Sequence, residues 1–236
     1  MNVLGQLRTA LGRARELRQL DRARSSRPKG CELVRLDHDK AVWRVPIPND
    51  ADRFMSAKSG GIDREKYVVQ VDTELFYRTW LAGTSAWGKR DSADCVLRSE
   101  MPADYKYRHA ADGFSHGRDN PVPLAEVDAW REGGRVRVGF TNGITRTFWL
   151  IANRAPAFPV EVRGREAAEL LHHATGFGPA PVCYEAMFAA TQRRQTAMPP
   201  KPPMAAPAEP VRERTIANKI EPRPGRTGPR RGGRSL

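Results

Sequence analysis

The chain has 236 residues, with 40 Lys or Arg against 27 Asp or Glu, so its formal net charge at pH 7 is +13. That charge belongs to the two ends, because residues 1–30 carry eight basic and two acidic side chains and residues 191–236 carry eleven and three. The near-neutral middle argues against the basic face of a specific DNA-groove binder. Three widely separated cysteines argue against a disulfide framework or a paired-cysteine zinc site. No apolar run approaches the roughly 20 residues of a membrane span.

The aromatic residues divide the chain into a core and two appendages. Every Trp, Tyr and Phe, from Trp43 to Phe188, lies within residues 31–190, and large aromatic side chains supply much of the area that closes a core. We therefore expect one globular α+β core over residues 31–190. Residues 191–236 form a basic tail rich in Pro and Gly, which predicts disorder because it buries too little apolar area to offset the entropy of ordering.

The first 30 residues predict a basic amphipathic helical arm. Apolar side chains recur at three- and four-residue spacing, with arginines on the other faces; they are Leu4, Leu7, Leu11, Ala14 and Leu17. Such a helix either packs on the core or on another copy of the chain, or binds a membrane surface or nucleic acid through its arginines. No continuous apolar region follows the charges, so we expect no signal peptide and a cytoplasmic protein.

The first half of the core predicts three strands and a helix. The strands cover residues 31–36, 40–47 and 66–71, and the helix covers residues 74–82. A turn at residues 37–39 joins the first two strands into a hairpin. Asp72 and Thr73 supply the N-cap of the helix, and Gly83 ends it.

Residues 83–119 are polar with scattered aromatic side chains, which predicts a long ordered loop. His109 and His116 in this segment, together with Asp112 and Asp119, are residue types that bind metals or transfer protons. Their spacing matches no metal motif, so a polar loop is the preferred interpretation.

The second half of the core alternates strands and helices. Pro121 and Pro123 favour an edge strand or a leading segment over residues 120–130, rather than a central strand. Asn142 and Gly143 then turn the chain from a strand into a helix. The predicted elements that follow are strands at residues 135–140 and 158–162 and helices at residues 145–154 and 165–175.

This order, with a Gly-x-x-Arg sequence at residues 143–146 between strand and helix, resembles the ParB/sulfiredoxin fold, in which that turn holds nucleotide phosphates. The resemblance covers residues 120–176 and implies a mixed sheet with flanking helices. Over residues 31–190 the chain resembles more specifically the plasmid fertility inhibition factors, which block conjugative transfer of a co-resident plasmid. Membership would place the protein in the bacterial cytoplasm or, through a partner, at the inner face of the membrane.

The resemblance implies that Gly143, Thr145 and Arg146 are cofactor-binding residues, with a nucleotide as the candidate cofactor. Backbone N–H groups at a helix start and a nearby guanidinium together make an anion site. Sulfiredoxins have Cys and His before the motif Arg, and ParB proteins have Glu and Arg, whereas this chain has Ile144 and Thr145. Redox repair is therefore not expected. The alternative is a structural turn in which Arg146 is merely solvated.

Two classes of function remain open. In the first, the chain is a non-enzymatic inhibitor that binds the coupling protein of a type IV secretion channel or the relaxase–DNA complex, while its basic tails attract DNA without sequence preference. In the second, it is a nuclease or nucleotide hydrolase in which Glu126, Asp128 and Glu161 hold a divalent ion near Arg146. Convergence of these carboxylates favours the enzyme, and their dispersal favours the inhibitor. The sequence itself assigns no metal site and no oligomeric state.

Overall fold

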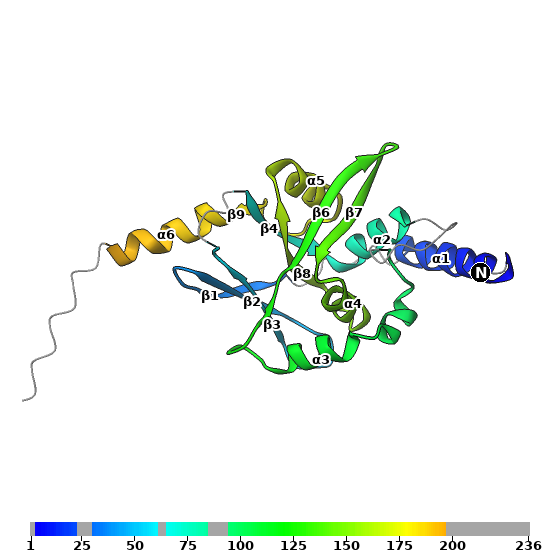
Figure 1. Cartoon of the computed structure of the whole chain (residues 1–236), viewed down its shortest axis with the longest axis horizontal. Coiled ribbons are helices and arrows are strands. Elements are labelled where there is room, and N and C mark those ends of the chain that lie inside the picture. Colours follow the sequence, from blue (N-terminus) through cyan, green and yellow to red (C-terminus); the bar gives the residue numbers. More distant parts are fainter. Residues whose placement is uncertain (1–2, 23–29, 61–64, 85–93, 197–236) are drawn as a thin grey trace, which may run out of the picture. The chain divides into compact units, whose positions relative to one another are not determined.

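Two β-sheets form the framework of the part of the chain that the computed structural model describes, residues 3–22, 30–60, 65–84 and 94–196 (Figure 1). The first sheet has the strand order β1-β2-β3-β5 and the second has the order β7-β6-β8-β4-β9. The strands are β1 (Glu32–Leu36), β2 (Lys40–Val45), β3 (Arg53–Lys58), β4 (Lys66–Asp72), β5 (Val122–Pro123), β6 (Ala125–Glu132), β7 (Arg135–Asn142), β8 (Ala157–Arg163) and β9 (Val182–Cys183). Both sheets combine parallel and antiparallel pairs, which confirms the predicted mixed α+β class.

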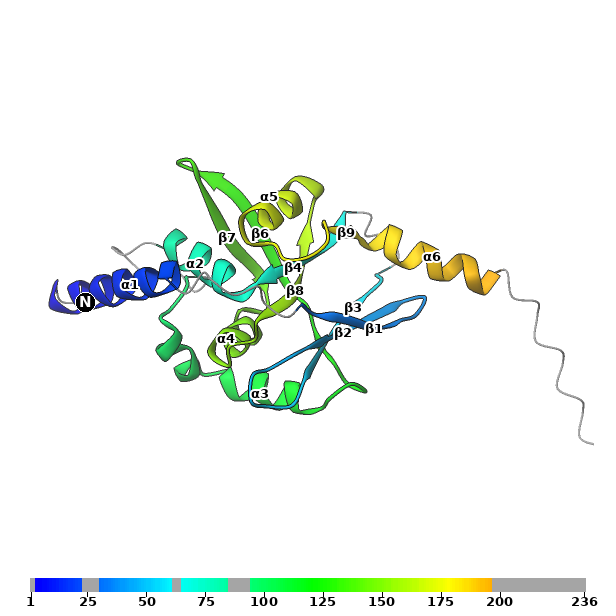
Figure 2. The same cartoon turned by 180° about the vertical axis from the view of Figure 1, so that it is seen from behind.

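Helices flank these sheets, as expected. They are α1 (Val3–Arg22), α2 (Thr73–Gly83), the 3-10 helix η1 (Arg98–Ala103), α3 (Tyr107–Ser115), α4 (Ile144–Ala152), α5 (Arg165–Thr175) and α6 (Tyr184–Thr196). Helices α2 and α5 pack against each other and against the second sheet, whereas α4 packs against η1 and α3. Seen from either side, α5 and α4 lie on opposite sides of β4 and β8 (Figures 1 and 2).

The first sheet begins with the predicted hairpin. Strands β1 and β2 pair antiparallel, and the N–H of Asp37 donates to the carbonyl oxygen of Lys40 over 2.8 Å. Strand β3 was not predicted. Its sequence RFMSAK lacks a clean alternation, since the three consecutive residues Met55, Ser56 and Ala57 are all buried.

The second sheet corrects the interpretation of residues 120–130. Strand β6 lies between β7 and β8, so it is an interior strand rather than an edge strand. Pro121 and Pro123 lie before β6, and Pro123 belongs to the two-residue strand β5, which pairs with β3. The prolines therefore remove no hydrogen-bond donor from the β6 ladder.

The N-terminus of α2 confirms the predicted cap. The carboxylate of Asp72 accepts a hydrogen bond from the N–H of Leu75 over 2.9 Å, which satisfies one of the free donors of the first turn. The helix buries Phe76 and Trp80, and the Trp80 ring stacks on Phe148 of α4 with centroids 5.3 Å apart. These aromatic contacts join the helices into one core.

Residues 94–119 are more ordered than the predicted loop, because they form η1 and α3; residues 85–93 lie outside the described part. His109 and Asp112 therefore lie on a helix. The side chain of Phe114 is buried and stacks on Trp149 at 4.5 Å between ring centroids. Tyr107, Ala110, Ala111 and Phe114 recur at helical spacing and pack on the core, so the sequence did contain a helical signal.

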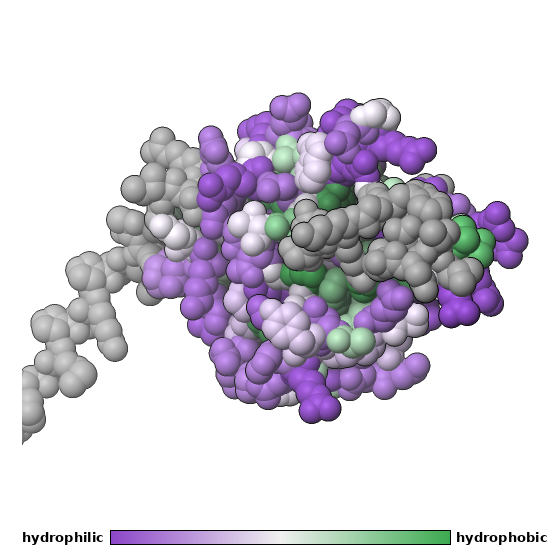
Figure 3. All heavy atoms as spheres, turned by 45° about the vertical axis from the view of Figure 1, so that its right-hand side comes forward, coloured by the Kyte–Doolittle hydropathy of each residue, from purple (hydrophilic) through white to green (hydrophobic). Residues whose placement is uncertain are grey.

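The N-terminal helix α1 packs on the core, which was one of the two expected arrangements. Leu20 is buried and Leu17 packs on the core, while Asp21 pairs with Arg78 at 2.6 Å between the carboxylate and Nε. Leu7 and Leu11 of the predicted stripe are instead 43% and 70% exposed. On the face seen in Figure 3, hydrophilic residues predominate and hydrophobic residues gather toward the middle.

The predicted disordered tail covers residues 191–236, and its residues 197–236 lie outside the described part of the chain. Helix α6 continues to Thr196, across the boundary proposed at residue 190, so the division of the chain at residues 30 and 190 stays a prediction. None of the helices in the described ranges is long and apolar enough to cross a membrane.

Candidate functional site

The predicted turn between β7 and α4 is present and requires a glycine. Gly143 is the N-cap residue of α4 and has the left-handed conformation φ 94°, ψ 15°. A Cβ atom at this position would lie 2.8 Å from both the Cα and the Cβ of Ala125, at the start of β6. Glycine thus serves here both for its positive φ and for the close approach of two backbones.

The guanidinium of Arg146 is bound to the protein itself. Its Nη1 donates to the carbonyl oxygens of Pro123 at 2.7 Å and Leu124 at 3.0 Å, and its Nη2 donates to the side-chain oxygen of Asn142 at 3.3 Å. Burial lowers the pKa of Arg146 from its ordinary value, and the charge of Glu126 opposes this shift. The interpretation of Arg146 as merely solvated is therefore wrong, because three hydrogen bonds join it to the residues before β6 and at the end of β7.

A cleft of about 540 Å³ opens beside this turn, and Gly143, Thr145 and Arg146 all line it. The N–H groups in the first turn of α4 have no partner within the helix. They form the positive end of the helix dipole, where anions bind favourably. Lys106 adds a positive charge from the residue before α3. Asp104 opposes it, and its carboxylate accepts a 3.4 Å hydrogen bond from the hydroxyl of Thr145. With one lysine and one aspartate in its lining, the cleft suits at most a singly charged oxyanion.

Most residues of this cleft were not assigned to it from the sequence, and Lys106 and His109 are the two that bring basic groups. Lys106 and His109 are about forty residues from the Gly-x-x-Arg turn in the chain, and the packing of α3 on α4 brings them to it. No local pattern signals that contact. The helical spacing of residues 107–114 could have shown the helix, though not its neighbour.

The three candidate catalytic carboxylates are only partly brought together. Glu126 and Glu161 are register partners on the parallel strands β6 and β8, and Asp128 lies on the same face of β6, two residues further on. Glu161 is occupied, because its carboxylate lies 2.8 Å from Nζ of Lys66 and accepts a 2.6 Å hydrogen bond from the hydroxyl of Tyr184. Within the described ranges, no three His, Cys, Asp or Glu side chains converge as metal ligands would.

Known proteins share both the sequence and the fold of this chain. Residues 68–176, from β4 to the end of α5, match the family described as "PFIN: Plasmid Fertility inhibition factor". Over 138 residues the chain is 40% identical to "Protein osa" of Shigella flexneri, and this alignment covers 58% of the chain and 70% of the relative. The chain belongs to the plasmid fertility inhibition factors.

A solved structure supports the same assignment and confirms the resemblance inferred from the sequence. It is described as "Crystal structure of Oncogenic Suppression Activity Protein - A Plasmid Fertility Inhibition Factor, Gold (I) Cyanide derivative". The similarity has a TM-score of 0.68 and an identity of 32%, and it covers 84% of this chain and 100% of the other. The turn at Gly143 and its cleft thus lie in the part of the chain that defines this fertility inhibition factor as a member of its family.

Proposed function

We propose that this fertility inhibition factor blocks conjugative transfer of a co-resident plasmid by binding a component of the transfer machinery in the donor cytoplasm. The component is the coupling protein of the secretion channel or the relaxase–DNA complex. The observation that carries the proposal is the 40% identity to a relative of which the alignment covers 70%, together with a solved relative named as a fertility inhibition factor.

Two features of the site favour binding over chemistry. Three of the five N–H donors of Arg146 already bind oxygen atoms of the protein, so in the observed arrangement this side chain acts mainly as an internal link. The charge of Glu161 is balanced by Lys66, and Asp128 is exposed on the outer part of β6. Neither arrangement resembles carboxylates poised around a metal ion.

The excess positive charge supplies a second, weaker attraction. The net charge of +13 arises from the terminal segments, and basic segments attract DNA phosphates or acidic protein surfaces without sequence preference. Through such contacts the protein would gather where the relaxase–DNA complex meets the coupling protein at the inner face of the membrane. This attraction would weaken steeply as salt rises.

A mating assay tests the proposal directly. Donor cells expressing the protein should yield far fewer transconjugants for at least one plasmid type, while the plasmid is still nicked at its transfer origin if the coupling protein is the target. Loss of nicking would instead identify the relaxase–DNA complex. Unchanged transfer for every plasmid type tested would refute the proposal.

The cleft at Gly143 favours one alternative, a nuclease or nucleotide hydrolase. Lys106, His109 and the start of α4 surround a space of ligand size. Titration of the purified protein with ATP and CTP, and incubation of single-stranded DNA with divalent ions, would reveal such an activity. The alternative predicts binding that is lost in Lys106→Ala and kept in Lys58→Ala, an exposed lysine on β3 outside the cleft. The leading proposal predicts no turnover.

A further inference from the structure

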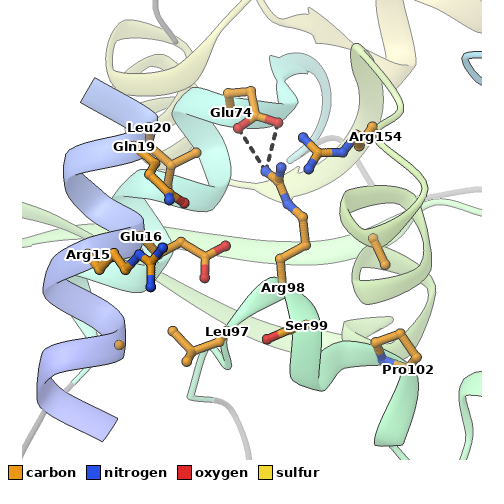
Figure 4. A pocket seen from close by; sticks show the side chains of 12 residues that line it. Arg15, Glu16, Gln19, Leu20, Glu74, Leu97, Arg98, Ser99, Pro102 and Arg154 are labelled. Atoms are coloured by element: carbon orange, nitrogen blue, oxygen red, sulfur yellow. Dashed lines mark hydrogen bonds and ion pairs between the residues drawn. The ribbon is translucent and has the colours of Figure 1, made fainter. Parts of the chain in front are cut away.

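A second pocket, of about 700 Å³, lies between α1, η1 and the C-terminal end of α4 (Figure 4). It shares no lining residue with the cleft at Gly143. The first cleft adjoins the start of α4 and this pocket adjoins its end. Its size is in the range of sites that hold a small ligand or a short peptide segment.

The floor of the pocket is a fixed ion pair. Nη2 of Arg98 lies 2.7 Å from both carboxylate oxygens of Glu74, and the Arg98 guanidinium lies 5.0 Å from the centre of the Tyr77 ring. The side chain of Arg98 is only 13% exposed. This pair balances its own charge and gives the pocket a rigid polar base.

Two further arginines line the pocket on opposite sides. Arg15 projects from α1 on one side, and Arg154 follows α4 on the other (Figure 4). Both residues are exposed, and neither forms an ion pair with any residue in the described part of the chain. Their guanidiniums are therefore available to an anionic group that enters from outside.

The backbone of Arg154 gives an independent indication of function. Its φ is 55°, and it occupies the left-handed position that ends α4, where its N–H donates to Ile151 and the N–H of Ala155 donates to Leu150. Glycine is the usual residue at this position, because side chains disfavour positive φ. The helix end needs no arginine here, so the strained residue points to a use for its side chain.

The rest of the lining distinguishes between anions. Glu16 repels a doubly charged phosphate more strongly than a singly charged carboxylate, whereas the charge of Glu74 is balanced by Arg98. Apolar surface also enters the pocket, from Leu20, Leu97 and Pro102. An extended polypeptide with alternating acidic and apolar side chains would complement both the arginines and the apolar residues of the lining.

We infer that this pocket receives a short acidic segment of a partner protein, with its carboxylates on Arg15 and Arg154 and its apolar side chains against Leu97 and Pro102. The inference rests on the proposed function in one respect, that the partner is a protein of the transfer machinery. It adds the place of contact and the chemistry of the segment.

Fluorescence anisotropy of the full chain with a labelled peptide of alternating leucine and glutamate tests the pocket by itself. Arg15→Ala and Arg154→Gly should each weaken binding by about tenfold or more, the effect of losing one charge-assisted contact. Arg18→Ala is the matched control, because Arg18 is an exposed arginine on α1 outside the pocket. Arg154→Gly should fold with an unchanged or higher thermal midpoint, so its loss of binding could not be attributed to unfolding.

Several outcomes would overturn the inference. The first is the absence of peptide binding by the wild-type chain at low salt. The second is equal binding by the two pocket variants and the control. The third is displacement of the peptide by millimolar inorganic phosphate that binds Arg154. The mating assay separates this inference from the proposed function. If Arg154→Gly loses the peptide but still suppresses transfer, the pocket is not the contact and the proposed function stands; if the wild type fails to suppress transfer, only the proposed function is refuted.

Discussion

The position that a Cβ atom of Gly143 would occupy lies 2.8 Å from the Cα atom of Ala125. Because Gly143 also has a φ of 94°, replacement by alanine adds both backbone strain and overlap with β6. We expect Gly143→Ala to lower the free energy of unfolding by about 2–4 kcal/mol, measured by urea denaturation.

The matched control is Gly134→Ala in the β6–β7 turn. Gly134 has a φ of 76°, but a Cβ atom there meets nothing within 4 Å. This variant should lose only about 1 kcal/mol, from backbone strain. Equal losses for the two variants would show that the contact with Ala125 contributes nothing.

Arg146→Ala should be destabilising, contrary to the view of an exposed arginine at a helix start. The carbonyl oxygens of Pro123 and Leu124 would lose a charged donor, and we expect a cost of about 1–3 kcal/mol. Arg163→Ala, at an exposed position of β8, should change stability by less than about 0.5 kcal/mol. An unchanged urea midpoint for Arg146→Ala would mean that these hydrogen bonds are replaced by water without loss.

Trp80→Ala should remove the centre of the aromatic core. Trp80 is 1% exposed, and its ring contacts Phe148 and Phe140 with centroids 5.3 Å and 4.6 Å away. The expected cost is about 3–5 kcal/mol, seen as a large fall in the thermal midpoint. Trp130, which is 46% exposed on β6, provides the control, and Trp130→Ala should cost under about 1 kcal/mol.

Asp72 should make stability depend on pH. Burial raises its pKa above the ordinary value of 3.8, although the N–H groups of Leu75 and Glu74 act in the opposite direction. The native state therefore holds this proton more tightly than the unfolded state. The contribution of the carboxyl group to stability is complete below the unfolded pKa and falls as pH rises through the folded pKa.

Asp72→Asn removes this titration and keeps a capping oxygen. Denaturation at several pH values should show the stability of the Asn variant, relative to wild type, increasing as pH rises above the ordinary carboxyl pKa of 3.8. Asp72→Ala, which lacks the cap, should be less stable than Asp72→Asn by about 1 kcal/mol at every pH. A difference between wild type and Asp72→Asn that is constant with pH would contradict the shift.

Local signals in the sequence predicted local structure. Asp72 marked the start of α2, and Asn142-Gly143 marked the turn into α4, because capping and positive φ depend on neighbouring residues. The interior position of β6 could not be predicted in this way, since it depends on pairing with β8. The prolines before β6 gave a misleading local signal.

In the candidate site too, features set by neighbouring residues could be predicted and features set by distant residues could not. The position of Gly143 follows from its own turn, but two of the three acceptors of Arg146, the carbonyl oxygens of Pro123 and Leu124, lie more than twenty residues away in the chain. The adjacency of Glu126 and Glu161 required only the correct strand order. The contacts of Glu161 with Lys66 and Tyr184 could not be predicted, because they depend on β9 and on the start of α6, which the sequence did not reveal.

The place of β4 between β8 and β9 has a consequence for biosynthesis. Residues 66–72 pair on one side with residues 157–163 and on the other with Val182 and Cys183, so both partners of this strand are synthesised long after it. Contacts so distant in the chain form slowly. During synthesis, the apolar side chains of Val68, Val69 and Val71 therefore stay unburied until their partner strands have been made. Chains that stall before β8 therefore present an unpaired apolar strand, which favours aggregation.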